Sequence, residues 1–549
     1  MISQSGAMPY TFFLVLFLED EMEQKAINPI MRLDYPDPDV IRVGDIYYMV
    51  TTTMHFMPGC EILRSYDLVH WEHVSFVFDK LDHTPGQCLT EGRNIYGKGM
   101  WAASLRFHKG MYYVCFVAND TGKTYLYTSK NIEGPWKKSY IDGFYHDASL
   151  LFDDDKVYLA YGNTDVYITQ LKPDLSGPLE GGLHRLAVSD SGHPGLGYEG
   201  SHFYKINGKY YLFLIHSLRD RWMRTEACFV ADSPDGEFAG GDVLVDDRGY
   251  CGQGVAQGGI VDTPEGKWYA ILFQDHGAVG RIPVLIPVEW KDGYPVFGEN
   301  GEVPIEIAVL DGKPGYHYEP LTQSDDFKLE KNLTSAAQKQ KYGCFGLKSV
   351  WQFNHEPELS LVTADREAGI LWMKTGKLCR TLTQAQNILT QRMYFPRCAA
   401  EVTVDAGALE EGDYAGICAL QGCYGMVAVT RRNGRLCVMM KSRVAEDLSL
   451  QESPEPINNK DSEWELAEID QSRIRLRIEA DFTEMKDEAK FFYLCDGVWK
   501  QIGITQKLVF QLDHFTGCRF GLFAYATEII GGKAGFMDFE YHKDLKIKE

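Results

Sequence analysis

The first half of the chain repeats one short pattern five times. In each copy a polar turn precedes aromatic residues and an apolar run, and the copies lie 45 to 65 residues apart. The copies are Val43 to Val50, His108 to Phe116, Asp154 to Tyr161, Ile206 to Leu214 and Pro264 to Phe273. Such a segment is typical of one hairpin of a four-stranded sheet, and repetition at this period indicates propeller blades. The sequence therefore predicts an all-β fold that begins with a five-bladed β-propeller, in which distant residues converge on one channel.

The second half of the chain has a different pattern. Glycine and proline cluster between residues 293 and 315, which indicates a domain junction. Beyond it, short alternating segments such as Ala400 to Val404 and Ile474 to Ile478 predict a β-sandwich. A chain of 549 residues also exceeds what one hydrophobic core usually holds. We therefore expect an N-terminal extension (1–27), a catalytic propeller (28–308), a linker (309–323) and a C-terminal β-sandwich (324–549).

Composition restricts the expected partners. The formal net charge is −22, whereas nucleic acids and anionic membranes attract clustered Lys and Arg, so neither is expected to bind. An aromatic content of 13% suits a neutral oligosaccharide substrate. Thirteen cysteines without a Cys-x-x-Cys pair indicate mostly free, buried thiols in a reducing compartment. The sequence sets no oligomeric state.

The apolar run Tyr10 to Leu18 has about the length of a signal-peptide core. No Lys or Arg precedes it, no small-residue cleavage site follows it, and the next residues, Glu19 to Glu23, are acidic. The run is also shorter than the roughly 20 apolar residues that span a bilayer. We therefore expect a cytoplasmic protein, with secretion as the alternative.

Three carboxylates each lie beside a predicted strand at the start of a different blade. Asp37 lies between two prolines that restrict its backbone, whereas Asp147 and Glu199 precede the third and fourth repeats. Hydrolysis of a glycosidic bond needs one protonated carboxyl for the leaving oxygen and one carboxylate that acts on water or the anomeric carbon. A third carboxylate nearby helps to keep the acid protonated. From the pattern alone, catalytic acids and ordinary turn residues remain alternatives.

The motifs around these acids resemble those of glycoside hydrolase family 43, whose fold is a five-bladed propeller. The matching segments are 35–39 (YPDPD), 101–104 (WAAS), 146–149 (HDAS), 199–202 (EGSH) and 280–281 (GR). The resemblance covers about residues 28 to 300, and the tail resembles the β-sandwich attached to many members. It implies that Asp37 is the general base, that Asp147 modulates the pKa and orients the acid, and that Glu199 is the general acid. It also implies inversion at the anomeric carbon, with the carboxylates of Asp37 and Glu199 roughly 6.5 to 9.5 Å apart.

The same resemblance implies residues that contact the sugar. Arg281 matches an arginine that hydrogen-bonds sugar hydroxyls, Trp101 matches an aromatic wall, and His55 with Phe56 matches the rim of the pocket. Each has an ordinary alternative, namely a surface ion pair for Arg281 and packing for the aromatic residues. Gln257 stands where many members carry a His associated with a central metal or water, and we assign it to the substrate pocket.

Two features bear on cofactors. An amide such as that of Gln257 is a poor ligand for transition metals, so we expect no required cofactor and no metal at the catalytic site. Acids such as Asp538 leave a structural calcium in the sandwich open. A second departure from the family pattern is Ala148, which follows Asp147 where proline is usual.

The combined interpretation is an exo-acting, inverting glycosidase. We expect it to release terminal β-D-xylose, α-L-arabinofuranose or both from xylan and arabinoxylan oligosaccharides. The alternative is a non-catalytic carbohydrate-binding propeller, which predicts the loss of one of the three acids. A fructan hydrolase on the related fold would carry an Asn-Asp-Pro motif near the N-terminus, where this chain has Pro36-Asp37-Pro38.

Overall fold

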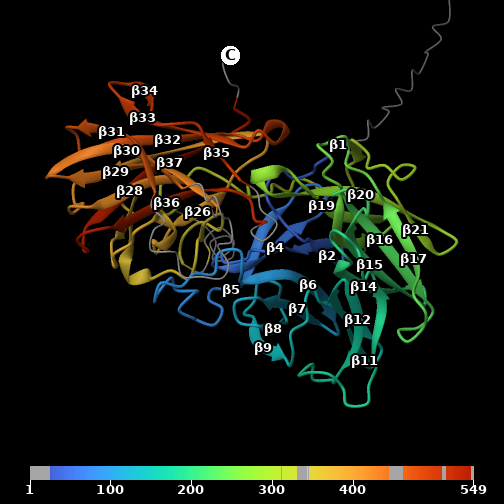
Figure 1. Ribbon diagram of the computed structural model, residues 1–549. Coiled ribbons are helices and arrows are strands. Elements are labelled where there is room, and N and C mark those ends of the chain that lie inside the picture. Colours follow the sequence, from blue (N-terminus) through green and yellow to red (C-terminus); the bar gives the residue numbers. More distant parts are fainter. Residues whose placement is uncertain are drawn as a thin grey trace, which may run out of the picture.

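The computed structural model describes residues 25–310, 312–330, 343, 345–421, 423–443, 461–509 and 515–545. Its elements are β-strands and four short 3-10 helices, arranged as two domains that lie side by side (Figure 1). None of the helices in the described ranges has the length and hydrophobicity needed to cross a membrane. The apolar run Tyr10 to Leu18 lies outside the described residues.

Five antiparallel four-stranded sheets form the blades of the N-terminal domain. The first blade contains β2 (Asp39–Val43), β3 (Ile46–Val50), β4 (Gly59–Ser65) and β5 (Glu72–Phe78). The second contains β6 (Met100–His108), β7 (Met111–Ala118), β8 (Lys123–Ser129) and β9 (Lys137–Ile141). The third contains β10 (Ser149–Asp153), β11 (Lys156–Asn163), β12 (Asp165–Leu171) and β13 (His184–Ser189). The fourth contains β14 (Glu199–Ile206), β15 (Lys209–Ser217), β16 (Arg224–Ala231) and β17 (Ala239–Leu244), and the fifth contains β18 (Ala256–Asp262), β19 (Trp268–Asp275), β20 (Arg281–Lys291) and β21 (Tyr294–Phe297).

The repeated sequence pattern corresponds to one feature of each blade. Its apolar run is the second strand, namely β3, β7, β11, β15 or β19, and its polar turn joins that strand to the first. In the first blade Gly44 has φ +63, a conformation that glycine adopts without strain. The first strands of the five blades contact one another in a closed ring, β2–β6–β10–β14–β18–β2. The prediction of a five-bladed propeller is confirmed.

The C-terminal domain is a β-sandwich, which confirms the prediction for this half of the chain. One sheet has the order β23-β26-β36-β28-β29-β30-β31, and the other has the order β24-β25-β37-β27-β32-β33-β34, with β35 paired to β33. Their bounds are β23 (Gln352–Phe353), β24 (Val362–Asp365), β25 (Ile370–Lys374), β26 (Leu389–Arg392), β27 (Arg397–Asp405), β28 (Asp413–Leu420), β29 (Tyr424–Arg432), β30 (Arg435–Arg443), β31 (Ser462–Ile469), β32 (Arg473–Asp481), β33 (Glu488–Cys495), β34 (Val498–Gln501), β35 (Gln506–Lys507), β36 (Arg519–Ala526) and β37 (Lys533–Lys543). The apolar faces of the two sheets form one core.

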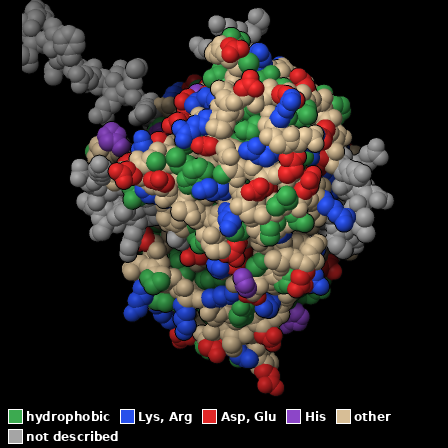
Figure 2. Space-filling view, turned by 90° about the vertical axis from the view of Figure 1, so that its left-hand side faces the viewer, with side chains coloured by type: hydrophobic (Ala, Val, Ile, Leu, Met, Phe, Trp, Pro, Cys, Tyr) green, Lys and Arg blue, Asp and Glu red, His purple; other side chains and the backbone are tan. Residues whose placement is uncertain are grey.

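The sandwich-side face of the molecule mixes acidic and basic side chains (Figure 2). Exposed ion pairs such as Arg435–Glu468, whose charged atoms lie 2.8 Å apart, place opposite charges next to each other. The cysteines in the described ranges are all free and most are buried, as the sequence predicts.

The start of the described chain is paired with the end of the propeller. Residues Lys25–Ile27 form β1, which pairs antiparallel with β22 (Glu306–Ala308). Next to it, the buried Asn28 side chain donates hydrogen bonds to the carbonyl oxygens of Leu285 and Pro304, at 2.8 and 2.9 Å. The last residues that the sequence assigned to an N-terminal extension therefore form a separate two-stranded sheet with β22.

A buried carboxylate connects the blades at the centre of the ring. Asp39 is fully buried; its Oδ2 accepts hydrogen bonds from the Leu105 N–H at 2.7 Å and from Arg106 Nη1 at 2.6 Å. His202 Nδ1 lies 3.2 Å from Asp39 Oδ1. Arg106 continues to blade three, where it donates to the Leu150 carbonyl at 2.7 Å and the Ser149 hydroxyl at 2.8 Å. We call Asp39, Arg106 and His202 the closing network because they join the first strands of four blades.

Substitution of Asp39 by alanine should destabilise the propeller strongly. Burial alone would raise the pKa of Asp39, but Arg106 and His202 outweigh burial and hold the pKa below its ordinary value. Removing the carboxylate leaves the Arg106 charge buried without its partner, which typically costs about 3–5 kcal/mol. We expect a clear fall in the urea midpoint of unfolding. Asp155→Ala is the matched control because that side chain is fully exposed, and equal midpoints for the two variants would contradict the prediction.

Candidate active site

Asp37 lies two residues before β2 in a fixed conformation. Its backbone φ is +51, and the Thr52 N–H donates to the carbonyl of the preceding Pro36 at 3.0 Å. The carboxylate accepts hydrogen bonds from the Thr52 hydroxyl at 2.6 Å and from Arg281 Nη1 at 2.6 Å. Burial raises the pKa of Asp37, while Arg281 and Thr52 act in the opposite direction. Both partners orient the carboxylate and favour its charged form.

Asp147 and Glu199 lie at the starts of neighbouring blades and are linked through the backbone. Asp147 has φ +48 and precedes β10, and its Oδ2 accepts the Gly200 N–H at 3.0 Å. Glu199 begins β14, and its Oε2 accepts a hydrogen bond from the Asn163 amide at 2.6 Å. The side chain of Glu199 is 20% exposed and that of Asp147 is 8% exposed. Glu199 is thus the acid with the better access to a ligand.

His146 lies between these two carboxylates. Its Nε2 is 3.6 Å from Asp147 Oδ2 and 3.5 Å from Glu199 Oε2. Burial alone would lower the pKa of His146, but the neighbouring Asp147 and Glu199 raise the pKa to about 9. At neutral pH the imidazole is therefore a cation that offsets the repulsion between the two acids.

Arg281 is held between two aromatic rings, one from each domain. Its guanidinium carbon lies 4.3 Å from the ring centre of Phe273 and 3.8 Å from that of Phe515, which belongs to the sandwich. The ring of Phe515 is also 5.4 Å from that of Trp101, which in turn lies 6.1 Å from His146. The structure thus brings predicted residues Trp101 and Arg281 together beside the three acids.

Irregular backbone accompanies the site on three of the innermost strands. The register shifts between Trp101 and Ser104 in β6, between Glu199 and His202 in β14, and between Ala256 and Gly258 in β18. Such bulges change the direction of side chains next to active sites. Trp101 therefore lies near the start of β6 and Glu199 at the start of β14, whereas the later residues of both strands pack inside their blades.

Gln257 lies next to the acid-bearing strand. It has φ +61, and its N–H donates to Glu226 Oε2 at 2.7 Å. A Cβ added to Gly200, which has φ +65, would lie 2.7 Å from the Gln257 side chain, so that close approach requires glycine. Burial raises the pKa of Glu226 well above its ordinary value.

His55 and Phe56 lie against the sandwich. They are 1% and 2% exposed, and their rings stack at 4.4 Å. The His55 ring lies 5.1 Å from that of His355, and the Arg519 guanidinium lies 3.5 Å above Phe56. Their assignment to the rim of a substrate pocket stays a prediction.

Sequence reasoning missed several residues of the site. Phe515 comes from a segment with no recognisable motif. Thr52 follows β3, Asn163 ends β11 and His146 lies in the motif 146–149, and the directions of their side chains depend on the fold. Asp275 lies 3.4 Å from Arg281 Nε and also pairs with the buried Arg224. Burial lowers the pKa of Arg224 to about 9, and the nearby Arg281 charge acts in the same direction. Of these residues, only His146 could have been found from the sequence, because it directly precedes Asp147 in the motif 146–149.

Comparisons with known proteins agree with this architecture. The family model described as glycosyl hydrolases family 43 matches residues 26–295, and that of the beta xylosidase C-terminal concanavalin A-like domain matches residues 345–542. This chain belongs to glycoside hydrolase family 43.

Among individual relatives, a beta-xylosidase of Formosa agariphila is 28% identical over 65% of this chain and 63% of its own length. A non-reducing end alpha-L-arabinofuranosidase of Bacteroides ovatus is 27% identical over 76% of this chain and 78% of its own length. A solved structure of a bifunctional GH43-CE protein from Bacteroides eggerthii is 40% identical, with a TM-score of 0.84 over 95% of this chain and 64% of that chain. The chain therefore spans less than two thirds of the length of the first and third of these proteins.

Replacement of His146 by glutamine should destabilise the protein in a pH-dependent manner. The folded-state pKa of about 9 lies above the ordinary value of 6.5, so the stabilisation is fully present below pH 6.5 and is lost as the pH rises through 9. We expect the variant to lose at most about 3 kcal/mol at pH 6 and almost nothing above pH 9. Urea unfolding from pH 5.5 to 10 measures this, with the exposed His317→Gln as control. A deficit that is the same at all pH values would refute the charged state of His146.

Proposed function

We propose that this chain is an exo-acting, inverting glycoside hydrolase that removes terminal β-D-xylose, α-L-arabinofuranose or both from xylan and arabinoxylan oligosaccharides. One observation carries the proposal. Three carboxylates from the starts of blades one, three and four lie at one site, each held by its own hydrogen bonds, and Arg281 and two aromatic residues lie beside them.

In the proposed reaction Asp37 is the general base. Its carboxylate takes a proton from a water molecule while the water oxygen bonds to the anomeric carbon. The bond from that carbon to the leaving oxygen breaks in the same step, and Glu199 gives its proton to the leaving oxygen. The anomeric configuration inverts because the water attacks from the side opposite the leaving group. The hydrogen bonds from Thr52 and Arg281 fix the direction in which Asp37 accepts the proton.

Asp147 is a positioning residue in this mechanism. Its carboxylate accepts the Gly200 N–H and so fixes the start of the strand that carries Glu199. Burial raises the pKa of Asp147, the adjacent His146 cation lowers it, and the neighbouring Glu199 raises it. The hydrogen bond from the Gly200 N–H, one residue beyond Glu199, supports a positioning role for Asp147.

The sandwich supports an exo-acting site. Phe515 covers the Arg281 guanidinium and lies against Trp101, so the second domain closes one side of the acid-bearing end of the propeller. A closed side favours a terminal sugar over the interior of a polymer. The names of the relatives, one a beta-xylosidase and one a non-reducing end alpha-L-arabinofuranosidase, support both sugars as candidates.

The two acids should respond differently to the leaving group. Glu199→Gln removes the proton donor, so hydrolysis of xylobiose should fall by about 10²–10⁴-fold, whereas 4-nitrophenyl β-D-xylopyranoside should lose less because nitrophenolate leaves without protonation. Asp37→Asn should lose activity on both substrates. A parallel assay with 4-nitrophenyl α-L-arabinofuranoside shows which of the two sugars the enzyme releases. Proton NMR of the first product shows whether the anomeric configuration is inverted.

The outcome also separates the enzyme from a binding module. A folded wild-type protein that binds xylobiose without hydrolysing either class of substrate would reject the enzymatic proposal in favour of a carbohydrate-binding propeller. Retention of configuration in the first product would reject the single-displacement mechanism.

Truncation of Phe515 should weaken substrate capture. Phe515→Ala removes the ring that covers Arg281, so the guanidinium gains water and loses its fixed orientation. We expect kcat/KM to fall roughly tenfold or more through a higher KM, because such packing contacts are typically worth about 1–2 kcal/mol. Phe107→Ala, at an exposed ring of blade two, is the control and should have unchanged kinetics. Equal kinetics in both variants would exclude the sandwich from the site.

A further inference from the structure

A second group of reactive side chains lies where the β5–β6 loop meets the sandwich. A cavity of about 440 Å³ is lined there by Lys80, His83 and Cys88 from the loop and by Glu356 and Glu358 from the sandwich. The carboxylate of Glu356 is almost completely buried, with a side chain 2% exposed, whereas the imidazole of His83 is 73% exposed. None of these residues takes part in the proposed hydrolysis.

Three different ligand types converge on one point in this cavity. His83 Nδ1 lies 2.6 Å from Glu356 Oε1 and 3.3 Å from Cys88 Sγ. The ligand atoms of all three residues lie within 4.8 Å of one another. Tetrahedral bonds of about 2.0–2.3 Å to a zinc ion place nitrogen, oxygen and sulfur ligands roughly 3.3–3.8 Å apart. The exposed His83 ring needs only a small movement to reach that spacing.

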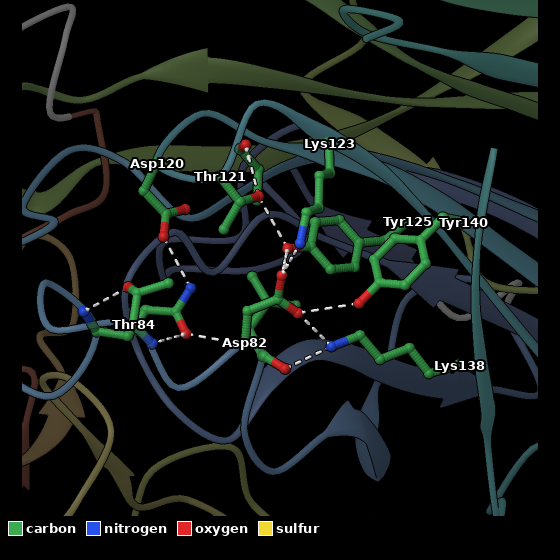
Figure 3. Close-up of polar contacts among 11 residues, drawn as sticks. Asp82, Thr84, Asp120, Thr121, Lys123, Tyr125, Lys138 and Tyr140 are labelled. Atoms are coloured by element: carbon green, nitrogen blue, oxygen red, sulfur yellow. Dashed lines mark hydrogen bonds and ion pairs between the residues drawn. The ribbon is translucent and has the colours of Figure 1, made fainter. Parts of the chain in front are cut away.

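The loop that carries His83 and Cys88 is held firmly by its neighbours (Figure 3). Asp82 accepts hydrogen bonds from Lys123 at 2.6 Å and Tyr125 at 2.9 Å, and it also pairs with Lys138 and Tyr140. These four partners come from blade two. Asp82, which directly precedes His83, is thereby anchored to blade two and fixes the direction of the loop.

Gln87 fixes the other end of the loop and connects it to the sandwich. Its side chain accepts the Asp82 N–H at 2.8 Å and donates to Asp120 at 2.7 Å. The carbonyl of Gln87 accepts the Glu356 N–H at 2.9 Å. The backbones of Cys88 and Glu356 are thus held opposite each other before any ligand binds, as a preorganised site requires.

We propose that His83, Cys88 and Glu356 bind one divalent transition-metal ion of the zinc type and that this ion joins the propeller to the sandwich. Imidazole, thiolate and carboxylate together suit Zn²⁺, whereas Mg²⁺ and Ca²⁺ take oxygen ligands. Two ligands come from the propeller and the third comes from the sandwich, so the ion fixes the contact between the domains.

Two groups, the Lys80 ammonium and the Cys88 thiol, have to change before the ion can bind. Lys80 Nζ lies 2.7 Å from Glu356 Oε1, and this half-exposed ammonium has to move aside. The metal–sulfur bond forms with the thiolate of Cys88 and not with its thiol. Metal binding therefore releases the thiol proton to solvent as the metal–sulfur bond forms.

Titration of the metal-free full-length chain with Co²⁺ tests this proposal directly. A thiolate bound to Co²⁺ absorbs in the near ultraviolet, so the wild type should develop this band with one equivalent, and Zn²⁺ should abolish it. Cys88→Ser should remove the band, while Cys251→Ser, at an exposed cysteine outside the cavity, should keep it. His83→Gln and Glu356→Gln should bind at least tenfold more weakly. No band in the wild type, or an undiminished band in Cys88→Ser, would overturn the proposal.

Two further readouts separate a metal site from a merely structural contact. Lys80→Met removes the competing ammonium and should bind Co²⁺ several-fold more tightly, whereas a loss of binding would place the ion elsewhere and refute the assignment. Zn²⁺ should also raise the unfolding temperature of the wild type and of Cys251→Ser but not of Cys88→Ser, because the ion binds the folded state. A Zn²⁺-dependent rise in Cys88→Ser equal to that of the wild type would likewise contradict the proposal.

Discussion

The arrangement of the whole propeller end depends on one buried charge, the carboxylate of Asp39. It lies two residues after Asp37, and its partners lie near the other residues of the site. Arg106 and Leu105 follow Trp101 on β6, and His202 follows Glu199 on β14. Arg106 in turn bonds to Ser149 and Leu150, which follow Asp147. The ion pair that closes the ring therefore also sets the relative positions of the three acids.

Blade five packs against the carboxylate of Asp39 at a glycine, Gly259. The Gly259 N–H donates to the Pro38 carbonyl at 2.9 Å, and a Cβ at Gly259 would lie 2.9 Å from Asp39 Oδ1. Glycine at this position lets β18 pack against β2. The contact between β18 and β2 at Gly259 thus leaves no room for a side chain.

A second buried carboxylate connects the site to the sandwich. Asp34 accepts the Arg281 N–H at 2.8 Å through one oxygen and the Gly517 N–H at 2.7 Å through the other. Burial raises the pKa of Asp34 to about 6, although both backbone hydrogen bonds lower it. Because Gly517 lies two residues after Phe515, this bridge holds the aromatic ring above Arg281. The second domain is in this way part of the candidate active site as well as a neighbour of it.

The amino-acid sequence determined the five blades, the attached sandwich and the three acids, because turn residues, strand periodicity and prolines beside an acid act over a few neighbouring residues. It also indicated Arg281 and Trp101 through the family motifs. Only the tertiary structure decided that His146 is a cation between two acids, that Phe515 covers Arg281, and that His55 and Phe56 are buried against the sandwich. These contacts join residues as far apart as the 483 positions between Asp34 and Gly517. Their geometry and charge depend on how two domains pack and exclude water, which no local pattern records.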